Sequence, residues 1–569
     1  MAVLGIHDGL GASASTIEKG NIIGAVSEER FTRQKNDVGF PFNSIEYLNE
    51  NFDEINQIAI SWIGGSAFIR RFLPKYEEKR RLLWRKQIKK PSHSKMKLNN
   101  IVYNFIQNQK PKRLWHSLGK TASHSLEKRI KKTGLQFDKF YYVDHHMAHA
   151  ASAYYTCGFD PCLIITLDGS GDGLSGTINI GRKGDIEKIE EFEASKSLGL
   201  FFGAVTSALD MRYSEDEGKT MSLAPYSYPI RIRELEKIIN IKDGKPNSNF
   251  TIKNELLMAE WIKNNILWKY NRESLAYAAQ HHLENCVMEI FRKYMGETGI
   301  QKIAVAGGVF ANVILNMRLR EMPEVKDFFV FPHMGDGGLS TGAALYVDHM
   351  INGKFNKKQI DNVYFGSSFK YQEIEQTLKK YKNKIEYEER SDISKFTGEL
   401  INKGNIILWF QDRMEFGPRA LGNRSILAPA GNIECKDKLN LIIKRRPYFQ
   451  PFCPTLLEED ANKILENYDK PNRFMSVGYT SKKKVKDKIK AVVHIDNTTR
   501  PQVLGDENKK YKTLIQTVKK ENGLGIVLNT SFNKHRYPIV CSPNDAVWAL
   551  LNTGVKHLSI GDFYVRKKD

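Results

Sequence analysis

The sequence lacks three features that would place it outside the cytoplasm. Its 569 residues contain no run of about 18 apolar residues, so no segment is predicted to cross a membrane. The N-terminus shows no basic segment followed by an apolar stretch, so no secretory signal peptide is expected. The six cysteines are scattered and form no CxxC pair, which argues against disulfides and a cysteine zinc site. We therefore expect a cytoplasmic protein, with peripheral attachment to the inner face of the membrane left open.

Acidic residues are scarce in one segment, and this segment accounts for most of the net charge. Residues 70–132 hold 20 lysines and arginines against 3 glutamates, while the whole chain carries a formal charge of +21. Trp84, Tyr103, Phe105 and Trp115 lie among the basic residues, a pattern that suits an anionic membrane surface or another polyanion. A solvated basic helical insertion explains the same composition, and nucleic acid is not the favoured partner.

Strands, glycine turns and helices alternate along the chain, which predicts an α/β protein. Residues 3–31 predict two strands around a glycine-rich turn, and residues 162–180 repeat that plan, which suggests two related lobes. Residues 302–321 and 328–350 each predict a strand, a glycine loop and a helix. Because glycine lets backbone amides approach a phosphate, the loops together favour nucleotide binding. A shift in composition near residue 360 predicts a domain boundary.

The stretch VDHHMAHA, residues 143–150, places two histidines four residues apart. On a helix, His145 and His149 lie on one face, one turn apart, whereas His146 lies off that face. Asp168 ends the apolar strand IITLD and Asp336 opens the loop GDGG, so each can present a carboxylate at a strand end. Two imidazoles and two carboxylates suit a divalent first-row metal, with Fe(II), Mn or Zn as candidates.

Longer motifs give the chain a specific resemblance to a known family. They are SEERFTRQK (27–35), VDHHMAHAASAYY (143–155), LDGSGDG (167–173), EGKTMSLAPY (217–226), GGVFAN (307–312), GDGG (335–338), RMEFGPRALGNRSIL (413–427) and LNTSFN (528–533). Over nearly its whole length the sequence resembles the O-carbamoyltransferases of the NodU, TobZ and CmcH type, which act in nodulation and antibiotic tailoring.

The resemblance implies a fold and a reaction. Residues 1–360 would form a two-lobed actin-like (ASKHA) domain similar to TsaD, with residues 70–132 as a basic insertion. Residues 361–569 would form a YrdC-like α/β domain. Such enzymes make carbamoyl-AMP from carbamoyl phosphate and ATP, with Mg for the ATP. They then transfer the carbamoyl group to a hydroxyl of a small molecule, sugar or glycan.

The resemblance also assigns roles to individual residues. The four metal candidates fall on the family's metal ligands, and the metal would bind a phosphate oxygen of the adenylate. Asp8, with His7 as its rival, would be the base that takes the acceptor's proton, and Lys35 would face the carbamoyl oxygen. The nucleotide-binding candidates are Gly169, Gly171, Glu217, Lys219, Gly307, Gly308 and Asn312. The carbamoyl-phosphate candidates are Arg419, Arg424, Lys444, Arg500 and Ser531, with Arg445 and Arg446 left open.

The chain also departs from the family pattern, which leaves the acceptor open. The departures are Leu10 with Gly11, Gln450, and Arg536 with Tyr537. A homodimer is compatible with the sequence. Two alternative functions are a tRNA-modifying enzyme of the threonylcarbamoyl type and a non-enzymatic, nucleotide-regulated binder of membranes or polyanions. The C-terminal motif GPRALGNRS argues against the tRNA enzyme.

Overall fold

The chain divides into two compact units. The N-terminal unit comprises Met1–Glu28 and Asn36–Ile360, and the C-terminal unit comprises Glu29–Lys35 and Asp361–Asp569. The computed structural model describes residues 2–52, 54–62, 82, 126–248, 250, 254–355 and 357–568, so the predicted basic insertion 70–132 lies mostly outside the described residues. Both units combine helices with β-sheets, which confirms the predicted α/β class.

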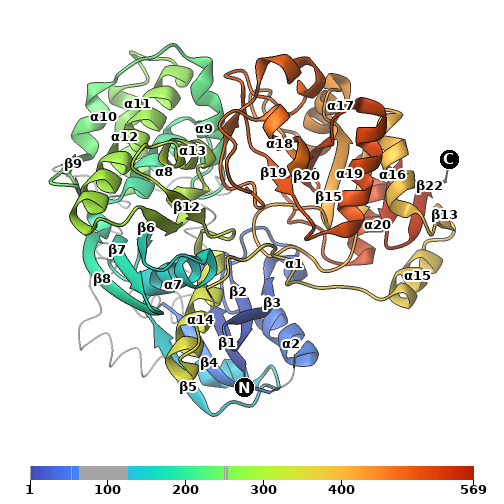
Figure 1. Cartoon of the computed structure of the whole chain (residues 1–569), viewed down its shortest axis with the longest axis horizontal. Helices are drawn as coiled ribbons and strands as arrows, with labels where there is room; N and C mark the ends of the chain where they lie inside the picture. The colour runs from blue at the N-terminus through green and yellow to red at the C-terminus, as the bar shows by residue number, and fades with distance from the viewer. Residues whose placement is uncertain are drawn as a thin grey trace. The chain divides into compact units, whose positions relative to one another are not determined.

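The first sheet of the N-terminal unit has the strand order β3-β2-β1-β4-β5 (Figure 1). Its strands are β1 (Ala2–His7), β2 (Ser13–Glu18), β3 (Asn21–Ser27), β4 (Ile55–Ser61) and β5 (Lys139–Val143). Strands β1, β2 and β3 pair antiparallel, whereas β1, β4 and β5 pair parallel. Every residue of β1 is buried, as expected for a central strand that is covered on both faces.

The second sheet of this unit repeats the plan of the first. Its order is β12-β11-β6-β7-β8. The strands are β6 (Cys162–Gly171), β7 (Leu174–Arg182), β8 (Asp185–Glu193), β11 (Lys302–Ala306) and β12 (Asp327–Val330). Again three strands pair antiparallel (β6, β7, β8) and three parallel (β6, β11, β12). The two sheets therefore share strand order and direction, in line with the two similar hairpins in the sequence.

Two helices connect the sheets. Helix α7 (His145–Cys157) packs on β6 and β11, helix α14 (Leu339–Asn352) packs on β1, β2 and β4, and the helices pack on each other (Figure 1). Their backbones are in contact, because a Cβ added at Gly342 of α14 would lie only 1.8 Å from the carbonyl oxygen of Ala148 in α7. This close packing holds the start of α7 near the loop that precedes α14.

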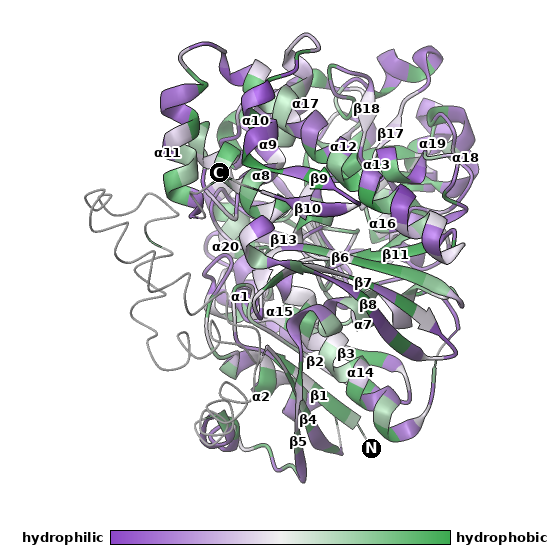
Figure 2. Ribbon diagram, turned by 90° about the vertical axis from the view of Figure 1, so that its left-hand side faces the viewer, coloured by the Kyte–Doolittle hydropathy of each residue, from purple (hydrophilic) through white to green (hydrophobic). Residues whose placement is uncertain are grey.

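Further helices belong to this unit. They are α8 (Leu198–Ala208), α9 (Glu217–Leu223), α10 (Arg233–Ile238), α11 (Glu255–Asn265), α12 (Arg272–Thr298) and α13 (Val313–Arg320), with α2 (Phe42–Asn51) on the first sheet and a hairpin of β9 (Asn240–Lys242) and β10 (Lys245–Asn247). Of these, α8 packs on β6 and α13 on β12. Figure 2 shows the hydrophobic colour along β6 and β11, whereas α10 is largely hydrophilic. The hydrophobic residues of the second sheet are thus concentrated in its parallel strands β6 and β11, which are largely buried.

The C-terminal unit is built on one eight-stranded sheet of order β13-β22-β21-β14-β15-β20-β16-β19. The strands are β13 (Ile385–Glu389), β14 (Ile407–Phe410), β15 (Arg424–Pro429), β16 (Cys453–Leu457), β19 (Gln502–Leu504), β20 (Ile526–Ser531), β21 (His557–Ile560) and β22 (Phe563–Lys567). A two-stranded sheet of β17 (Tyr479–Thr480) and β18 (Thr498–Thr499) is separate. The large sheet is mainly antiparallel, with parallel pairs at β14–β21 and β16–β19.

Helices and one short N-terminal segment complete the C-terminal unit. The helices are α15 (Tyr371–Lys380), α16 (Ile393–Asn402), α17 (Ile433–Lys438), α18 (Glu458–Ile464), α19 (Lys509–Asn522) and α20 (Pro543–Thr553), with a π-helical turn at Leu439–Lys444. Helix α1 (Glu29–Thr32) also belongs here, because Arg30 donates to the carbonyl of Gly417 (2.8 Å) and Arg33 to that of Ile539 (2.7 Å). In the part of the chain that the structure describes, no helix has the length and apolar character needed to span a bilayer.

Candidate metal centre and anion pocket

Helix α7 starts at the first histidine of the predicted pair. Asp144 caps the helix, since its carboxylate accepts a hydrogen bond from the backbone N–H of Met147 at 3.0 Å. His145 and His149 are one helical turn apart, and both side chains are buried. The local sequence therefore presents two imidazoles from one face of a buried helix.

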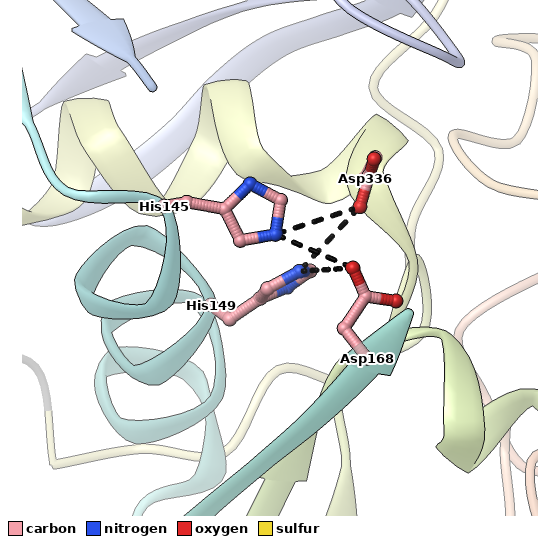
Figure 3. Close-up of side chains that lie close together, drawn as sticks. All are labelled: His145, His149, Asp168 and Asp336. Atoms are coloured by element: carbon pink, nitrogen blue, oxygen red, sulfur yellow. Dashed lines mark hydrogen bonds and ion pairs between the residues drawn. The ribbon is translucent and has the colours of Figure 1, made fainter. Parts of the chain in front are cut away.

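Two carboxylates from other elements meet these imidazoles (Figure 3). Asp168 lies in β6, and Asp336 begins the 3-10 helix Asp336–Gly338. Nε2 of His145 lies 3.3 Å from Oδ2 of Asp168 and 3.8 Å from Oδ1 of Asp336; for Nε2 of His149 the same distances are 3.9 and 3.6 Å. The four donor atoms lie within 4.8 Å of one another, so the structure brings all four predicted ligands together.

The protonation states of this cluster suit a metal. Burial lowers the pKa of His149 to about 4 and that of His145 well below its ordinary value, so both rings are neutral at neutral pH. Burial alone would raise the pKa of Asp168, but the hydrogen bond to His145 and the neighbouring imidazoles hold it below its usual range. Oδ1 of Asp168 accepts from the backbone N–H of Gly308 at 2.9 Å, which leaves Oδ2 facing the imidazoles.

This donor set fits a divalent cation. Nε2 of His149 is buried and has no hydrogen-bond partner among the described residues, so its lone pair is left for a metal. Two neutral imidazoles and two carboxylates balance a 2+ charge and suit Fe(II), Mn or Zn. His146 is directed elsewhere, since its Nδ1 lies 2.9 Å from Oγ1 of Thr166.

Two residues that were not predicted hold His145 in place. Asp172 accepts a hydrogen bond from the backbone N–H of His145 at 2.9 Å. Trp62 packs edge-on against the His145 ring, with centroids 5.1 Å apart, and stacks on His7 at 5.6 Å. Its φ of 85° is costly for a residue with a Cβ. Asp172 belongs to the motif LDGSGDG and could have been suspected, whereas Trp62 has no local sequence signal.

Gly171 offers a direct test of the packing around His145. A Cβ at Gly171 would lie 2.2 Å from Cγ of His145, whereas the nearest atom to a Cβ at Gly169 is the Tyr213 hydroxyl at 3.8 Å. We expect Gly171→Ala to displace the imidazole and weaken metal binding by about tenfold or more. Gly169→Ala is the matched control. Metal titration of both purified variants checks this, and equal affinity in the two would contradict it.

The predicted nucleotide-binding glycines lie next to Asp168. Gly169 and Gly171 follow it in β6, Gly308 donates to its carboxylate, and Gly307 has a φ of 109°. A Cβ at Gly307 would lie 2.1 Å from the carbonyl oxygen of Leu167, so this turn requires glycine. These glycines therefore shape the loops around the metal cluster.

The other predicted nucleotide-binding residues already have partners. Lys219 forms an ion pair with Asp216 at 2.9 Å, and burial raises the pKa of Glu217 to about 7. Asn312 caps α13 and donates to Oε1 of Gln280 at 2.7 Å. The geometry gives Asn312 a structural task in addition to any contact with a ligand.

The two predicted catalytic residues fall in different units. Asp8 is buried directly after β1, beside His7. Lys35 groups with the C-terminal unit. Burial lowers the pKa of Lys444, and the nearby charges of Arg446 and Lys35 lower it further. Lys35 thus lies close to Lys444, in the same unit as the predicted carbamoyl-phosphate residues.

Two of those carbamoyl-phosphate residues, Lys444 and Ser531, meet at the end of β20. The π-helical turn presents Lys444, whose buried ammonium donates to Oγ of Ser531 (3.2 Å) and Oδ1 of Asn533 (2.7 Å). Arg500 is 3% exposed, and within the described ranges none of its three guanidinium nitrogens has a hydrogen-bond partner. A buried guanidinium with unused donors is costly unless an anion binds it.

The charges of two further arginines act on this group, Arg446 on Lys444 and Arg419 on Arg500. Burial lowers the pKa of Arg446 to about 10, and the positive charge of Arg419 lowers it further. Burial also lowers the pKa of Arg500, and Arg419 again acts in the same direction. Arg446 also packs over the ring of Phe452, 5.5 Å from its centroid. We call Arg419, Lys444, Arg446, Arg500 and Ser531 the anion pocket. Arg446, which the sequence left open, belongs to it.

Arg424 differs from the other arginines that were predicted to bind carbamoyl phosphate. It is fully buried and stacks 3.6 Å above the ring centroid of Phe410. Its guanidinium donates to backbone carbonyls, including those of Asn423 at 2.9 Å and Ser367 at 3.2 Å. These contacts give Arg424 a structural task, in which it fixes the loops at the ends of β14 and β15.

Comparison with known proteins shows the family to which the chain belongs. The family model for the carbamoyltransferase N-terminus matches residues 3–345, and that for the carbamoyltransferase C-terminus matches residues 398–567. An uncharacterised protein of Methanocaldococcus jannaschii is 32% identical over 97% of this chain and 96% of its own length. The nodulation protein NolNO of Sinorhizobium fredii is 31% identical over 99% of this chain and 79% of its own length. The 3'-hydroxymethylcephem-O-carbamoyltransferase of Streptomyces clavuligerus is 27% identical over 46% of this chain and 48% of its own length. The chain belongs to the carbamoyltransferase family and is an enzyme of that class.

Proposed function

We propose that this enzyme is an ATP-dependent O-carbamoyltransferase. The C-terminal unit makes carbamoyl-AMP from carbamoyl phosphate and ATP with release of pyrophosphate. The N-terminal unit transfers the carbamoyl group to a hydroxyl of a small molecule, sugar or glycan. In fold terms, we propose an actin-like N-terminal unit, which the repeated sheet plan supports, and a YrdC-like C-terminal unit.

The buried guanidinium of Arg500 is the observation that carries this proposal. Its donors lie unused among the residues described, beside the cations of the anion pocket. Carbamoyl phosphate supplies a phosphate group with the acceptor oxygens that such a fork binds. Burial, and then the charges of Arg446 and Lys35, lower the pKa of Lys444, which donates to Ser531, so a bound anion would favour its ammonium form. The pocket thus has the charge and the donors that an acyl phosphate requires.

The metal cluster of the N-terminal unit supports the transfer step. His145, His149, Asp168 and Asp336 would hold the metal, which when bound would supply positive charge to the adenylate phosphate. The glycine loops beside Asp168 let backbone amides approach a phosphate. Asp8 is the proposed base for the acceptor's proton, since it is a buried carboxylate in the same unit.

The two alternative functions differ from this proposal in the acceptor or in the absence of a transfer reaction. A tRNA threonylcarbamoyl enzyme would take tRNA as its acceptor, and a nucleotide-regulated binder would perform no transfer. The family assignment favours an enzyme over the binder. The motif GPRALGNRS, which lies in the segment matched by the carbamoyltransferase C-terminus model, is the sequence feature that argues against the tRNA enzyme.

A screen of acceptors tests the proposal. The purified protein is incubated with carbamoyl phosphate, ATP and either metabolite and glycan fractions or tRNA from the source cells. We expect mass spectrometry to find a gain of one carbamoyl group in a hydroxyl-bearing small molecule or glycan. Omission of either co-substrate should abolish that gain. Modification of tRNA alone would support the tRNA enzyme instead.

A further inference from the structure

Cys453 differs from the other cysteines of this chain. All six lie within the described ranges; five are buried, and Cys453 is partly exposed. Burial raises the pKa of Cys286 to about 12 and raises those of Cys162 and Cys541 as well. Because a thiolate is the reactive form, these buried thiols are expected to react slowly. Cys453 is therefore the thiol most open to reagents from solution.

The sheet register places Cys453 on the same face as Ser531 of the anion pocket. Cys453 begins β16 and pairs with Asn529 of β20 on one side. On the other side β16 runs parallel to β19, with Thr455 paired to Gln502. Cys453 stands two residues before Thr455, and Arg500 stands two residues before Gln502. Residues two apart in a strand share a face, so Cys453 lies on the face of Asn529 and Ser531, whereas Arg500 lies just before the start of β19.

A second observation points to an anion at this place. The guanidinium of Arg500 is buried, and its three nitrogens have no partner within the described parts of the chain. The pKa values of both Arg446 and Arg500 are sensitive to charge at position 453, which agrees with the placement of Cys453 by the sheet register. An anion held by these arginines would therefore lie close to a partly exposed thiol.

We propose that Cys453 is a modification site for small anionic electrophiles, which the arginines of the anion pocket bring to its sulfur. With iodoacetate as the probe, the sulfur attacks the methylene carbon, an S–C bond forms, the C–I bond breaks, iodide leaves and the thiol proton passes to solvent. The product leaves a carboxylate next to Arg446 and Arg500, so modification fills the pocket. The inference rests on the anion pocket and not on turnover of carbamoyl phosphate.

Competitive alkylation of the full-length protein tests this inference. The protein is treated in parallel with iodoacetate and with neutral iodoacetamide, and each cysteine is followed by peptide mass spectrometry. A cationic site raises the local concentration of an anion by about tenfold or more. We expect Cys453 to be labelled first among the six cysteines. Its iodoacetate to iodoacetamide rate ratio should exceed that of free glutathione by about tenfold, fall at high salt, and fall with added inorganic phosphate.

Two variants sharpen the test. Arg446→Gln removes one guanidinium of the pocket and should lower the rate ratio, whereas Arg445→Gln changes an exposed neighbour and should leave it unchanged. A rate ratio at Cys453 equal to that of glutathione, or earlier labelling of another cysteine, would overturn the inference. If the labelling is as expected but the enzyme never consumes carbamoyl phosphate, the proposed function fails and the modification site stands. If carbamoyl phosphate is used normally but Cys453 is not labelled selectively, the modification site fails and the proposed function stands.

Discussion

His149→Ala is expected to lose its tightly bound divalent metal, with affinity reduced by more than about 100-fold. The reason is that residues outside the ligand set already contribute 10–100-fold to metal affinity, and a ligand contributes more. His149 supplies a buried imidazole nitrogen that has no hydrogen-bond partner among the described residues and lies 3.6 Å from Asp336 and 3.9 Å from Asp168. Metal analysis and metal titration of the purified variant measure the loss. Carbamoyl transfer should fall with it.

His146→Ala is the matched control for that variant. His146 is as buried as His149 and one helical residue from His145, but it contacts Thr166 rather than the cluster. The two substitutions create cavities of similar size in the same helix, so a general loss of stability would affect both. We expect His146→Ala to keep most of its metal. Full metal content in His149→Ala, or equal loss in both, would contradict the assignment.

Arg500→Gln is expected to lower kcat/KM for carbamoyl phosphate by roughly 100-fold or more. A charge-assisted hydrogen bond contributes about 1.5–3 kcal/mol, and an arginine fork makes two of them to a phosphate. Because about 1.4 kcal/mol corresponds to a factor of ten, even two weak bonds amount to roughly 100-fold. Transfer from supplied carbamoyl-AMP should continue, since the metal cluster lies in the other unit.

Arg445→Gln serves as the control for this second variant. Arg445 is exposed and directly precedes Arg446 of the anion pocket. Because both variants replace an arginine with glutamine, Arg445→Gln and Arg500→Gln change the net charge of the protein by the same amount. We expect its rates with both donors to stay near those of the unaltered enzyme. If Arg500→Gln lost activity equally with carbamoyl phosphate and carbamoyl-AMP, Arg500 would serve a shared site or the fold, and the separation of the two half-reactions would be wrong.

Local patterns predicted much of the architecture and the metal ligands. The α/β class follows from alternating strand and helix patterns, and the four candidate ligands were predicted from an i, i+4 histidine pair and two aspartates. Such features depend on residues close in sequence, where helical and strand periodicities apply. Such features can therefore be recognised in a single sequence. Asp168 lies within β6 and Asp336 begins a 3-10 helix, so neither stands at the strand end that the sequence predicted.

Contacts between distant segments could not be predicted in this way. Residues 29–35 lie near the N-terminus but group with the C-terminal unit, which moves Lys35 to the neighbourhood of Lys444. Trp62 contacts His145 across the first sheet and α7 without any local signal. These placements depend on tertiary packing, which no periodicity encodes.

Arginines with similar local sequences also have different tasks. Arg424 and Arg500 both stand in polar, turn-rich stretches, and both were predicted to bind phosphate. The structure shows Arg424 donating to backbone carbonyls, whereas the donors of Arg500 have no such partners among the residues described. Only a count of hydrogen-bond partners in three dimensions separates a structural guanidinium from one that is left for a ligand.

Pyrophosphate release by the purified enzyme tests the central claim most directly. The enzyme is supplied with ATP, Mg and a divalent metal, with and without carbamoyl phosphate. Formation of carbamoyl-AMP predicts that pyrophosphate appears only when ATP and carbamoyl phosphate are both present, and that Arg500→Gln greatly reduces it. Pyrophosphate release that is independent of carbamoyl phosphate, or carbamoyl transfer to an acceptor without ATP, would contradict the account.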